Sequence, residues 1–390
     1  TDSTAARNTA YGLTTLDAIT TGDDNTVMGH AAGTALQDGA ENVAIGTNSM
    51  AAATSAGQNT CVGHNSGAAL SSGSLYNVLL GHGAGASMTT GNRNIAIGVS
   101  SMDGFDTEAH NLGIGVSALG GSVAGGEYNV AIGNYALDAL TSGDNNIAIG
   151  YEAGTDITTG GQNTLVGSYA GPNLTTGATQ RNIMIGYATG FYMTDETNNL
   201  GIGALACGGV GTPNGGEYNV AVGNLSLEDL TSGDSNTTLG VAAGRNITTG
   251  ANNTALGYNC MGDIDTGSGN INVGDASSNG ANTNHSIVIG QAASGKGSNT
   301  GFISPNGGAV YQGNNSSTWS TTSDRRIKKN IVDNDIGLEK INKIKVRNFE
   351  YRLPEEITEV PSHAAIKKEG VQVGAIAQEI QEVLPDVVVQ

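Results

Sequence analysis

The sequence of 390 residues contains 61 glycines but only 6 prolines and 4% aromatic residues, and its formal net charge is −19. So few large side chains exclude a single thick hydrophobic core, and the lack of a regular glycine at every third position excludes collagen. The negative charge disfavours nucleic acids and anionic membranes as partners, because phosphate binding requires a basic surface. No apolar run is long enough to span a bilayer, so we expect no membrane insertion.

The charge is unevenly distributed along the chain. Up to Thr322 there are 5 basic and 23 acidic residues, whereas the remainder contains 11 basic and 12 acidic residues. The cysteines Cys61, Cys207 and Cys260 lie far apart and form no CxxC motif. We therefore interpret Cys61 and Cys260 as small core residues, not as parts of a disulfide or a zinc site. The sequence predicts neither a metal nor a cofactor.

A pentad of the form Asn-(Val/Ile/Leu/Thr)-x-(Ile/Val/Leu/Met)-Gly dominates the first part of the chain. Its closing glycines are 16 to 20 residues apart, mostly 17. Such a period indicates one short structural unit stacked many times, which is a solenoid. A degenerate copy, Asn8-Thr-Ala-Tyr-Gly12, opens the series, so we expect the chain to be a fragment of a longer protein. The glycines stand at positions 29, 46, 63, 81, 98, 115, 133, 150, 167, 186, 203, 223, 240, 257, 274 and 290.

Each pentad is predicted to form a short strand. Its second and fourth positions are apolar or Thr in every copy, and this alternation, ended by glycine, is typical of a strand with one buried face. Three residues after each glycine the side chain is small, as in Ala32 and Ser49, which indicates a narrow coil. The stretches between pentads begin Leu140-Thr-Ser-Gly, Ile157-Thr-Thr-Gly and Leu174-Thr-Thr-Gly, and we expect them to be outward loops.

Asparagine opens the pentad in 15 of these 16 copies, with Ser286 as the exception. Stacked asparagines at one corner of a solenoid can hydrogen-bond along it as a ladder, and asparagine tolerates turn geometry. We therefore interpret the pentad residues as architectural and not catalytic. The clearest members of this ladder are Asn42, Asn94, Asn129 and Asn146, with Gly46, Gly98, Gly133 and Gly150.

A longer duplication lies over the short repeat. Gly126-Glu-Tyr-Asn-Val-Ala-Ile-Gly133 returns 90 residues later as Gly216-Glu-Tyr-Asn-Val-Ala-Val-Gly223. Glu127 and Glu217 are therefore one structural position copied twice. Glycoside hydrolysis needs two different carboxyl groups that face each other, and no such pair stands out.

The pentad followed by a small residue resembles the head repeats of YadA-type trimeric autotransporter adhesins over about residues 8–293. The resemblance implies a left-handed parallel β-roll whose inner strands line a trimer axis. The period of this chain is longer, so the outer part of each coil must be longer too. We predict an all-β, trimeric parallel β-solenoid over residues 1–293, because three rods could bury the apolar face that a single rod leaves exposed.

Residues 294–322 break the period and contain Trp319, the single tryptophan, and we predict a neck of short strands there. At Ser323 the composition changes, and residues 323–390 are predicted to form a small α+β domain. Two segments have helical spacing of apolar residues, and the first continues into a strand. The helical positions are Leu338, Ile341 and Ile344 and then Ile376, Ile380, Val383 and Leu384, and the strand positions are Val346, Phe349 and Tyr351.

The new domain opens with Ser323-Asp-Arg-Arg-Ile-Lys-Lys-Asn-Ile331. Taken alone, this is a charged, solvated stretch. A serine hydroxyl becomes a nucleophile when a base removes its proton, and Lys328 can do so if neighbouring cations or burial depress its pKa. Asp324 could orient the pair.

This segment resembles the opening signature of the peptidase S74 family of intramolecular chaperone domains, found at the C-terminus of bacteriophage tail spikes, tail fibres and endosialidases. A later block, Gly374-Ala-Ile-Ala-Gln-Glu with Leu384-Pro385, resembles the second conserved part of that family. The resemblance implies that Ser323 is the nucleophile and Lys328 its general base, that Thr322–Ser323 is the scissile bond, and that the domain trimerises before it cuts itself off. The supporting positions of the signature are Asp324, Arg326 and Asn330.

These patterns predict a structural virion protein, the shaft of a phage tail fibre or spike for host attachment. The expected partners are two further copies, tail-fibre or baseplate proteins of the virion, and a host cell-surface receptor, for which a polysaccharide is one candidate. The expected location is the extracellular virion after synthesis in the host cytoplasm. A trimeric bacterial adhesin and a tailspike that degrades polysaccharide are the two competing functions that the rod would also suit.

Any enzyme activity of the chain is expected to be limited to its own backbone. The S74 resemblance implies one autoproteolytic event without turnover of an external substrate. A domain that chaperones assembly and never cleaves is the alternative that the sequence leaves open.

Overall fold

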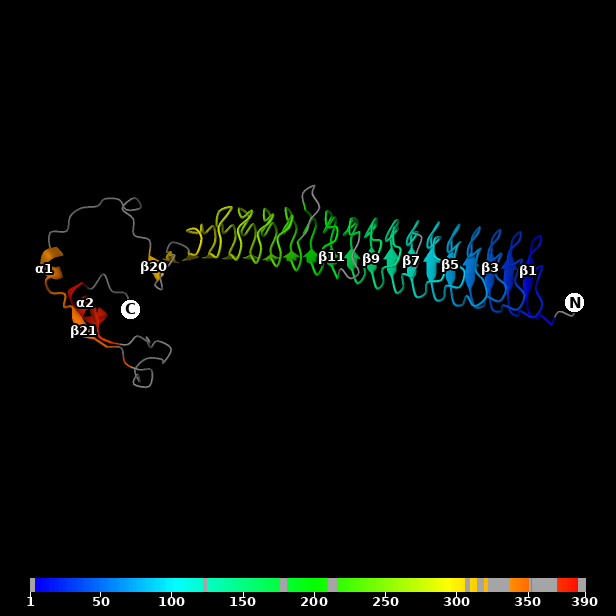
Figure 1. The fold of residues 1–390 in the computed structure, drawn as a ribbon, viewed down its shortest axis with the longest axis horizontal. Helices are drawn as coiled ribbons and strands as arrows, with labels where there is room; N and C mark the ends of the chain where they lie inside the picture. Colours follow the sequence, from blue (N-terminus) through cyan, green and yellow to red (C-terminus); the bar gives the residue numbers. More distant parts are fainter. Residues whose placement is uncertain are drawn as a thin grey trace. The chain divides into compact units, whose positions relative to one another are not determined.

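The computed structural model describes residues 4–121, 125–175, 181–209, 216–305, 309–313, 319–321, 337–350, 352 and 370–384. The chain divides into two compact units, Thr1–Thr322 and Ser323–Gln390. The first is a parallel β-solenoid, and the second contains short helices and a small antiparallel sheet (Figure 1). The mostly β class predicted from the sequence, with its parallel solenoid, is confirmed.

The solenoid is a rod in which one three-residue strand from each coil pairs with the next in register (Figure 1). Ala131 in one coil, for example, lies opposite Ala148 in the next. The strands are β1 (Thr9–Tyr11), β2 (Thr26–Met28), β3 (Val43–Ile45), β4 (Thr60–Val62), β5 (Val78–Leu80), β6 (Ile95–Ile97), β7 (Leu112–Ile114), β8 (Val130–Ile132), β9 (Ile147–Ile149), β10 (Thr164–Val166), β11 (Ile183–Ile185), β12 (Leu200–Ile202), β13 (Val220–Val222), β14 (Thr237–Leu239), β15 (Thr254–Leu256), β16 (Ile271–Val273) and β17 (Ile287–Ile289).

Each strand ends at the pentad glycine for two physical reasons. The glycine φ angles are 133° at Gly46, 138° at Gly98, 140° at Gly133 and 144° at Gly150, a region that side chains rarely adopt. A Cβ atom at Gly150 would also lie 2.3 Å from the carbonyl oxygen of Gly167 in the next coil. The recurring glycine therefore permits both the turn and the close stacking of coils.

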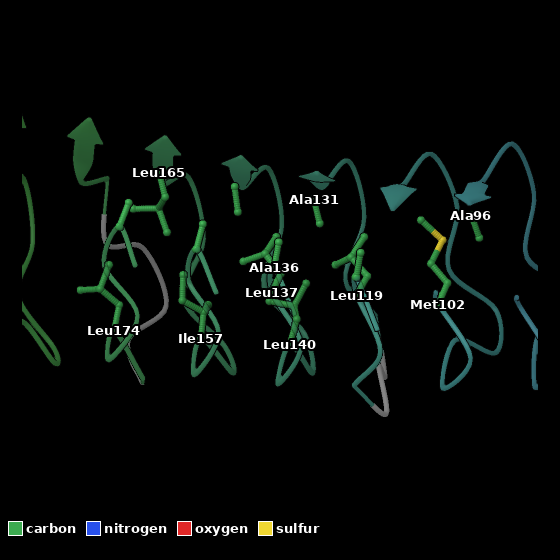
Figure 2. Close-up of a cluster of buried hydrophobic side chains, with 14 of the residues drawn as sticks. Ala96, Met102, Leu119, Ala131, Ala136, Leu137, Leu140, Ile157, Leu165 and Leu174 are labelled. Atoms are coloured by element: carbon green, nitrogen blue, oxygen red, sulfur yellow. The ribbon is translucent and has the colours of Figure 1, made fainter. Parts of the chain in front are cut away.

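The core runs inside the coils of this single chain (Figure 2). Its first row is the third pentad position, represented by Ala131, Ala148 and Leu165, whose side chains are completely buried. The small residue after the pentad, such as Ala136, is buried beside it. The larger residues at the second and fourth positions point the other way, because the narrow coil admits only limited volume at its centre.

The expectation that the stretches between pentads are outward loops is wrong for their first residues. Leu140, Ile157 and Leu174 are completely buried and form a second row of the core (Figure 2). In the coils of Ile157 and Leu174, the fourth residue after the pentad glycine is itself a glycine, which leaves room for these side chains. A Cβ atom on Gly154 would lie 3.0 Å from the Cδ1 atom of Ile157, and one on Gly171 would lie 2.8 Å from the Cδ1 atom of Leu174.

The parallel ladder continues past β17 and then reverses. Strand β18 (Gly301–Ile303) pairs in parallel with β17 and antiparallel with β19 (Val310–Gln312), which pairs antiparallel with β20 (Trp319–Thr321). Phe302 packs with Val288 and Ala293 in a small cluster of its own, and the Lys296 ammonium lies 4.6 Å from the centre of the Phe302 ring. This cluster covers the apolar interior where the regular coils end.

The second unit contains α1 (Gly337–Ile341), β21 (Arg347–Phe349), β22 (Gln372–Gly374) and α2 (Ala377–Val383). Strands β21 and β22 pair antiparallel, with Asn348 opposite Val373. The two helices and the strand β21 lie in the segments whose apolar spacing predicted them.

Candidate functional site

The residues predicted to cut the chain lie outside the described residues. They are Thr322, Ser323, Asp324, Arg326, Lys328 and Asn330. Their roles therefore stay predictions from the S74 signature, and the structure describes only later parts of the second unit.

An ion pair joins the strand and the helix of the second unit. Arg347 on β21 donates through Nε and Nη2 to the two carboxylate oxygens of Glu379 on α2, at 3.1 and 2.8 Å. This hydrogen-bonded pairing raises the pKa of Arg347 and lowers that of Glu379. This two-point pairing fixes the orientation of α2 against β21 but adds little to the stability of the unit, because Arg347 is exposed and Glu379 is only half-buried.

The second unit has little core of its own in the part that the structure describes. No side chain of α1 or α2 is buried. Leu338 and Val373 are 73% and 72% exposed, and Ile341, Val346 and Val371 are also exposed. Apolar side chains that remain exposed in this way are typical of a surface that another chain covers.

The rod has a comparable surface. We call the second and fourth pentad residues of β2 to β17 the strand face. Ile147 and Ile149 are 39% and 37% exposed, while Ala148 between them is buried. The face predicted to meet neighbouring rods is thus a mainly apolar stripe, interrupted by threonine in some strands, that one chain leaves partly open to solvent. Its further exposed apolar members are Met28, Ile95, Ile183, Ile185, Ile202, Leu239, Leu256, Ile271, Ile287 and Ile289.

The pentad asparagines are buried and bonded to one another. Asn42 donates from its backbone N–H and from Nδ2 to Oδ1 of Asn25, at 3.0 Å each, and Nδ2 also donates to the carbonyl of Ala56. Asn94, Asn129 and Asn146 likewise donate their backbone N–H groups to the preceding asparagine. At the exception, Ser286, the hydroxyl donates to Oδ1 of Asn270 at 2.8 Å. The side chains of these pentad residues are buried and hydrogen-bonded to neighbouring coils, which supports a structural and not a catalytic role.

Glu127 and Glu217 repeat one structural corner, in the coils of β8 and β13. The backbone N–H of Glu127 donates to Asp144, and that of Glu217 donates to Asp234, both at 2.8 Å. The two glutamates are five coils apart along the rod, so they do not face each other as a glycosidase pair would.

The sequence reasoning missed two buried carboxyl groups, Glu108 and Glu196, which are 2% and 4% exposed. Both stand three residues before a pentad asparagine. Other coils have a small residue at this position, such as Gly143 or Ala56, and a glutamate in its place is the feature by which the sequence could have revealed them. Glu108 accepts backbone N–H groups from Asp106, Thr107 and, one coil on, Gly125.

Burial raises the pKa of Glu196 to about 7, against the lowering effect of backbone N–H groups, including that of Thr194. The carboxyl therefore titrates near neutral pH within the rod. The thiols of Cys61, Cys207 and Cys260 are free and buried, and burial raises the pKa of Cys207 to about 12, which makes it unreactive.

Within the described residues, no three His, Cys, Asp or Glu side chains come together in a way that could hold a metal ion. Among the helices of those same residues, none has the length and apolar character needed to cross a membrane.

Comparison with known proteins identifies the C-terminal part of the chain. A search of curated proteins found no match. A family model described as "Chaperone of endosialidase", of the Peptidase S74 family, matches residues 323–389. These residues begin where the second compact unit begins and include both sequence blocks that resembled the family. The chain therefore carries a peptidase S74, chaperone-of-endosialidase domain behind its β-solenoid.

Proposed function

We propose that this protein forms the shaft of a bacteriophage tail fibre or spike, in which three copies assemble along their strand faces and the S74 domain sets their register. The observation that carries the proposal is the S74 match directly behind a solenoid with an apolar face open to solvent. Its location would be the virion, where the shaft extends towards a host receptor and is anchored by other tail proteins.

The repeats create a register problem that such a domain solves. Successive coils have the same backbone pairing and nearly the same apolar strand face, so three rods could slip by one coil at little cost in contacts. Specificity must then come from a part of the chain that does not repeat. The second unit is such a part, and its exposed apolar residues favour a fold completed by assembly.

In the proposed self-cleavage, Lys328 removes the hydroxyl proton of Ser323, and the Oγ atom attacks the carbonyl carbon of Thr322. The C–N bond between the two residues breaks, and the proton passes to the freed amino group of Ser323. An ester then joins Thr322 to the Ser323 side chain, and water hydrolyses it. The product is a rod ending at Thr322 and a separate chaperone domain.

The test is intact mass and SDS gel mobility of the full-length chain beside Ser323→Ala, with Ser320→Ala as the matched control. Loss of everything after Thr322 in the wild type and in Ser320→Ala, but not in Ser323→Ala, would support the nucleophile assignment. If all three proteins stay whole and form heat-resistant trimers, the domain is a permanent clamp and the cleavage proposal is wrong. If they stay monomeric, the assembly proposal is wrong as well.

A further inference from the structure

A row of contacting tyrosines lies on the surface of four consecutive coils. Its members are Tyr135, Tyr151, Tyr169 and Tyr187, which we call the tyrosine ladder. The ring centres of successive members are 6.1, 5.4 and 6.1 Å apart, and successive rings meet edge to face at 79° to 89°. Phe191 adds a further aromatic ring beside Tyr169, with the two ring centres 6.2 Å apart.

The coil geometry holds this row in place. Tyr151 and Tyr187 directly follow a pentad glycine, whereas Tyr135 and Tyr169 are one residue further along. The backbone N–H of Tyr169 donates to the carbonyl of Tyr151 in the preceding coil, at 2.9 Å. The rings are therefore attached to hydrogen-bonded backbone, and binding to them would cost little conformational entropy.

The ladder is an open surface with polar groups at its edge. Tyr135, Tyr151 and Tyr187 are 38%, 40% and 58% exposed. The phenol of Tyr151 is hydrogen-bonded to Glu152, which raises the pKa of Tyr151 to about 12. Aromatic faces with a negative quadrupole attract polarised C–H groups, while hydroxyl and carboxylate groups at their edge can bond to hydroxyls. Sugar rings present both kinds of group.

The ladder differs from the strand face in extent and chemistry. The strand face is aliphatic and runs through nearly all coils, as a contact between whole rods requires. The tyrosines occupy only four coils, and the same position holds Ala204 and Asn224 in coils further along. A local, hydroxyl-bearing surface therefore fits a ligand better than a contact that repeats along three rods.

The negative charge around the tyrosine ladder favours uncharged ligands over polyanionic ones. Between residues 129 and 199 the only basic side chain is Arg181, while Asp138, Glu152 and Asp156 lie in the coils of the ladder. A polyanionic chain would be repelled there. Strands are spaced by about 4.8 Å, which is close to the length of one pyranose unit in an extended polysaccharide. We propose that the tyrosine ladder binds an extended, uncharged polysaccharide that runs along the rod.

This proposal deepens the attachment function proposed above by naming a ligand class and a site, and binding can be measured independently of cleavage and assembly. The experiment is electrophoresis of the full-length protein through native gels that contain dextran, mannan, amylose or galactan, with hyaluronate as the polyanionic comparison. The variants are Tyr151→Ala/Tyr187→Ala and Tyr151→Phe/Tyr187→Phe. Tyr258→Ala is the matched control, because Tyr258 is 62% exposed and also follows a pentad glycine, but lies outside the ladder.

We expect at least one uncharged polysaccharide to retard the wild type, and the double alanine variant to bind about tenfold more weakly. Tyr258→Ala should bind like the wild type. The double phenylalanine variant keeps the ring faces but loses two hydroxyls, so it should bind more weakly than the wild type and more tightly than the double alanine variant. The proposal is overturned if no uncharged polysaccharide retards the wild type, if hyaluronate alone does, or if the double alanine variant binds as well as the control. Sedimentation of the same proteins tests whether the ladder is instead an interface between copies of this chain. If the double alanine variant dissociates into smaller species than the wild type, the ladder is such an interface and the ligand proposal is overturned.

Discussion

Asn146 donates twice to the same atom of Asn129. Its backbone N–H and its Nδ2 lie 2.9 and 3.1 Å from Oδ1 of Asn129, and Nδ2 also donates to the carbonyl of Gly160 at 2.9 Å. The Oδ1 atom of Asn146 in turn accepts two bonds from Asn163. One amide therefore ties together three successive coils, with all of its hydrogen-bonding capacity used.

Replacing Asn146 with alanine should consequently destabilise the rod strongly. The change removes the Oδ1 atom that accepts both the backbone N–H and the Nδ2 group of Asn163, and we expect a loss of roughly 2–5 kcal/mol in the free energy of unfolding. Urea unfolding followed by circular dichroism measures this. Ser142→Ala, an exposed change in the same coil, is the control, and equal midpoints for the two variants would contradict the role given to the ladder.

The pentad glycines should tolerate no side chain. Gly150→Ala combines a φ of 144° with a Cβ atom 2.3 Å from the carbonyl oxygen of Gly167, so neighbouring backbone must move. Gly73 also has a positive φ, 89°, but a Cβ atom there would meet nothing within 4 Å. We expect Gly73→Ala to cost about 1–2 kcal/mol from backbone strain alone, and Gly150→Ala to cost clearly more. Thermal unfolding separates the two, and similar losses would show that contact between coils is unimportant.

The strand face can be tested by placing charges on it. If three rods bury this face, Ile147→Lys/Ile149→Lys puts several like charges into an apolar interface, and the trimer should lose its resistance to heating in SDS. The fold of each coil should survive, because both side chains point away from the chain's own core. The control variant, Ser142→Lys/Thr159→Lys, adds the same charge at exposed positions outside the strand face. Equal behaviour of the two double variants in sedimentation would exclude the strand face as the interface.

The raised pKa of Glu196 should make the stability of the folded rod depend on pH. Its pKa rises from an ordinary 4.5 to about 7 on folding, mainly through burial, so the folded chain binds more protons than the unfolded chain between these values. The stabilising contribution is fully present below about pH 4.5 and is lost as the pH rises through about 7.

We therefore expect Glu196→Gln to melt at a higher temperature than the wild type at pH 8, and the difference to shrink or vanish at pH 4.5. Scanning calorimetry across this range provides the measurement. Glu41→Gln removes an exposed carboxylate and serves as the control. If the melting temperatures of the wild type and Glu196→Gln change with pH in parallel, ionisation of Glu196 does not destabilise the folded chain, and the prediction is wrong.

The strands and turns could be predicted from the sequence because each coil repeats the same physical requirement. A glycine is needed wherever φ is near 140° and the next coil is close, so it recurs visibly at Gly133 and Gly150. The same pattern predicted that a single rod leaves its large apolar strand residues exposed, although it gave no view of how little volume the coil interior admits. Large apolar residues ordinarily point inward, but here the narrow coil accepts Ala148 and directs Ile147 and Ile149 to the surface.

The functional surfaces differ in how visible they are in the sequence. The signature around Ser323 and Lys328 can be recognised only by its resemblance to a family, because spacing alone does not distinguish it from a solvated charged segment. The tyrosine ladder is hidden because its members alternate between two positions, as at Tyr151 and Tyr169, and only the stacked coils bring them into one row. Glu196 differs from the small residues that other coils have at its position, but only the structure shows that this position is buried.

The in-register pairing of every coil with the next makes the length of the rod adjustable in whole units. Removing residues 130–219, the span between Asn129 and Val220, would join two equivalent positions of the 90-residue duplication and restore the same neighbours on both sides of the junction. Each coil gained or lost changes the reach by about 4.8 Å without requiring a new type of contact. The length of such a rod can change by recombination between near-identical segments while the C-terminal S74 domain stays the same.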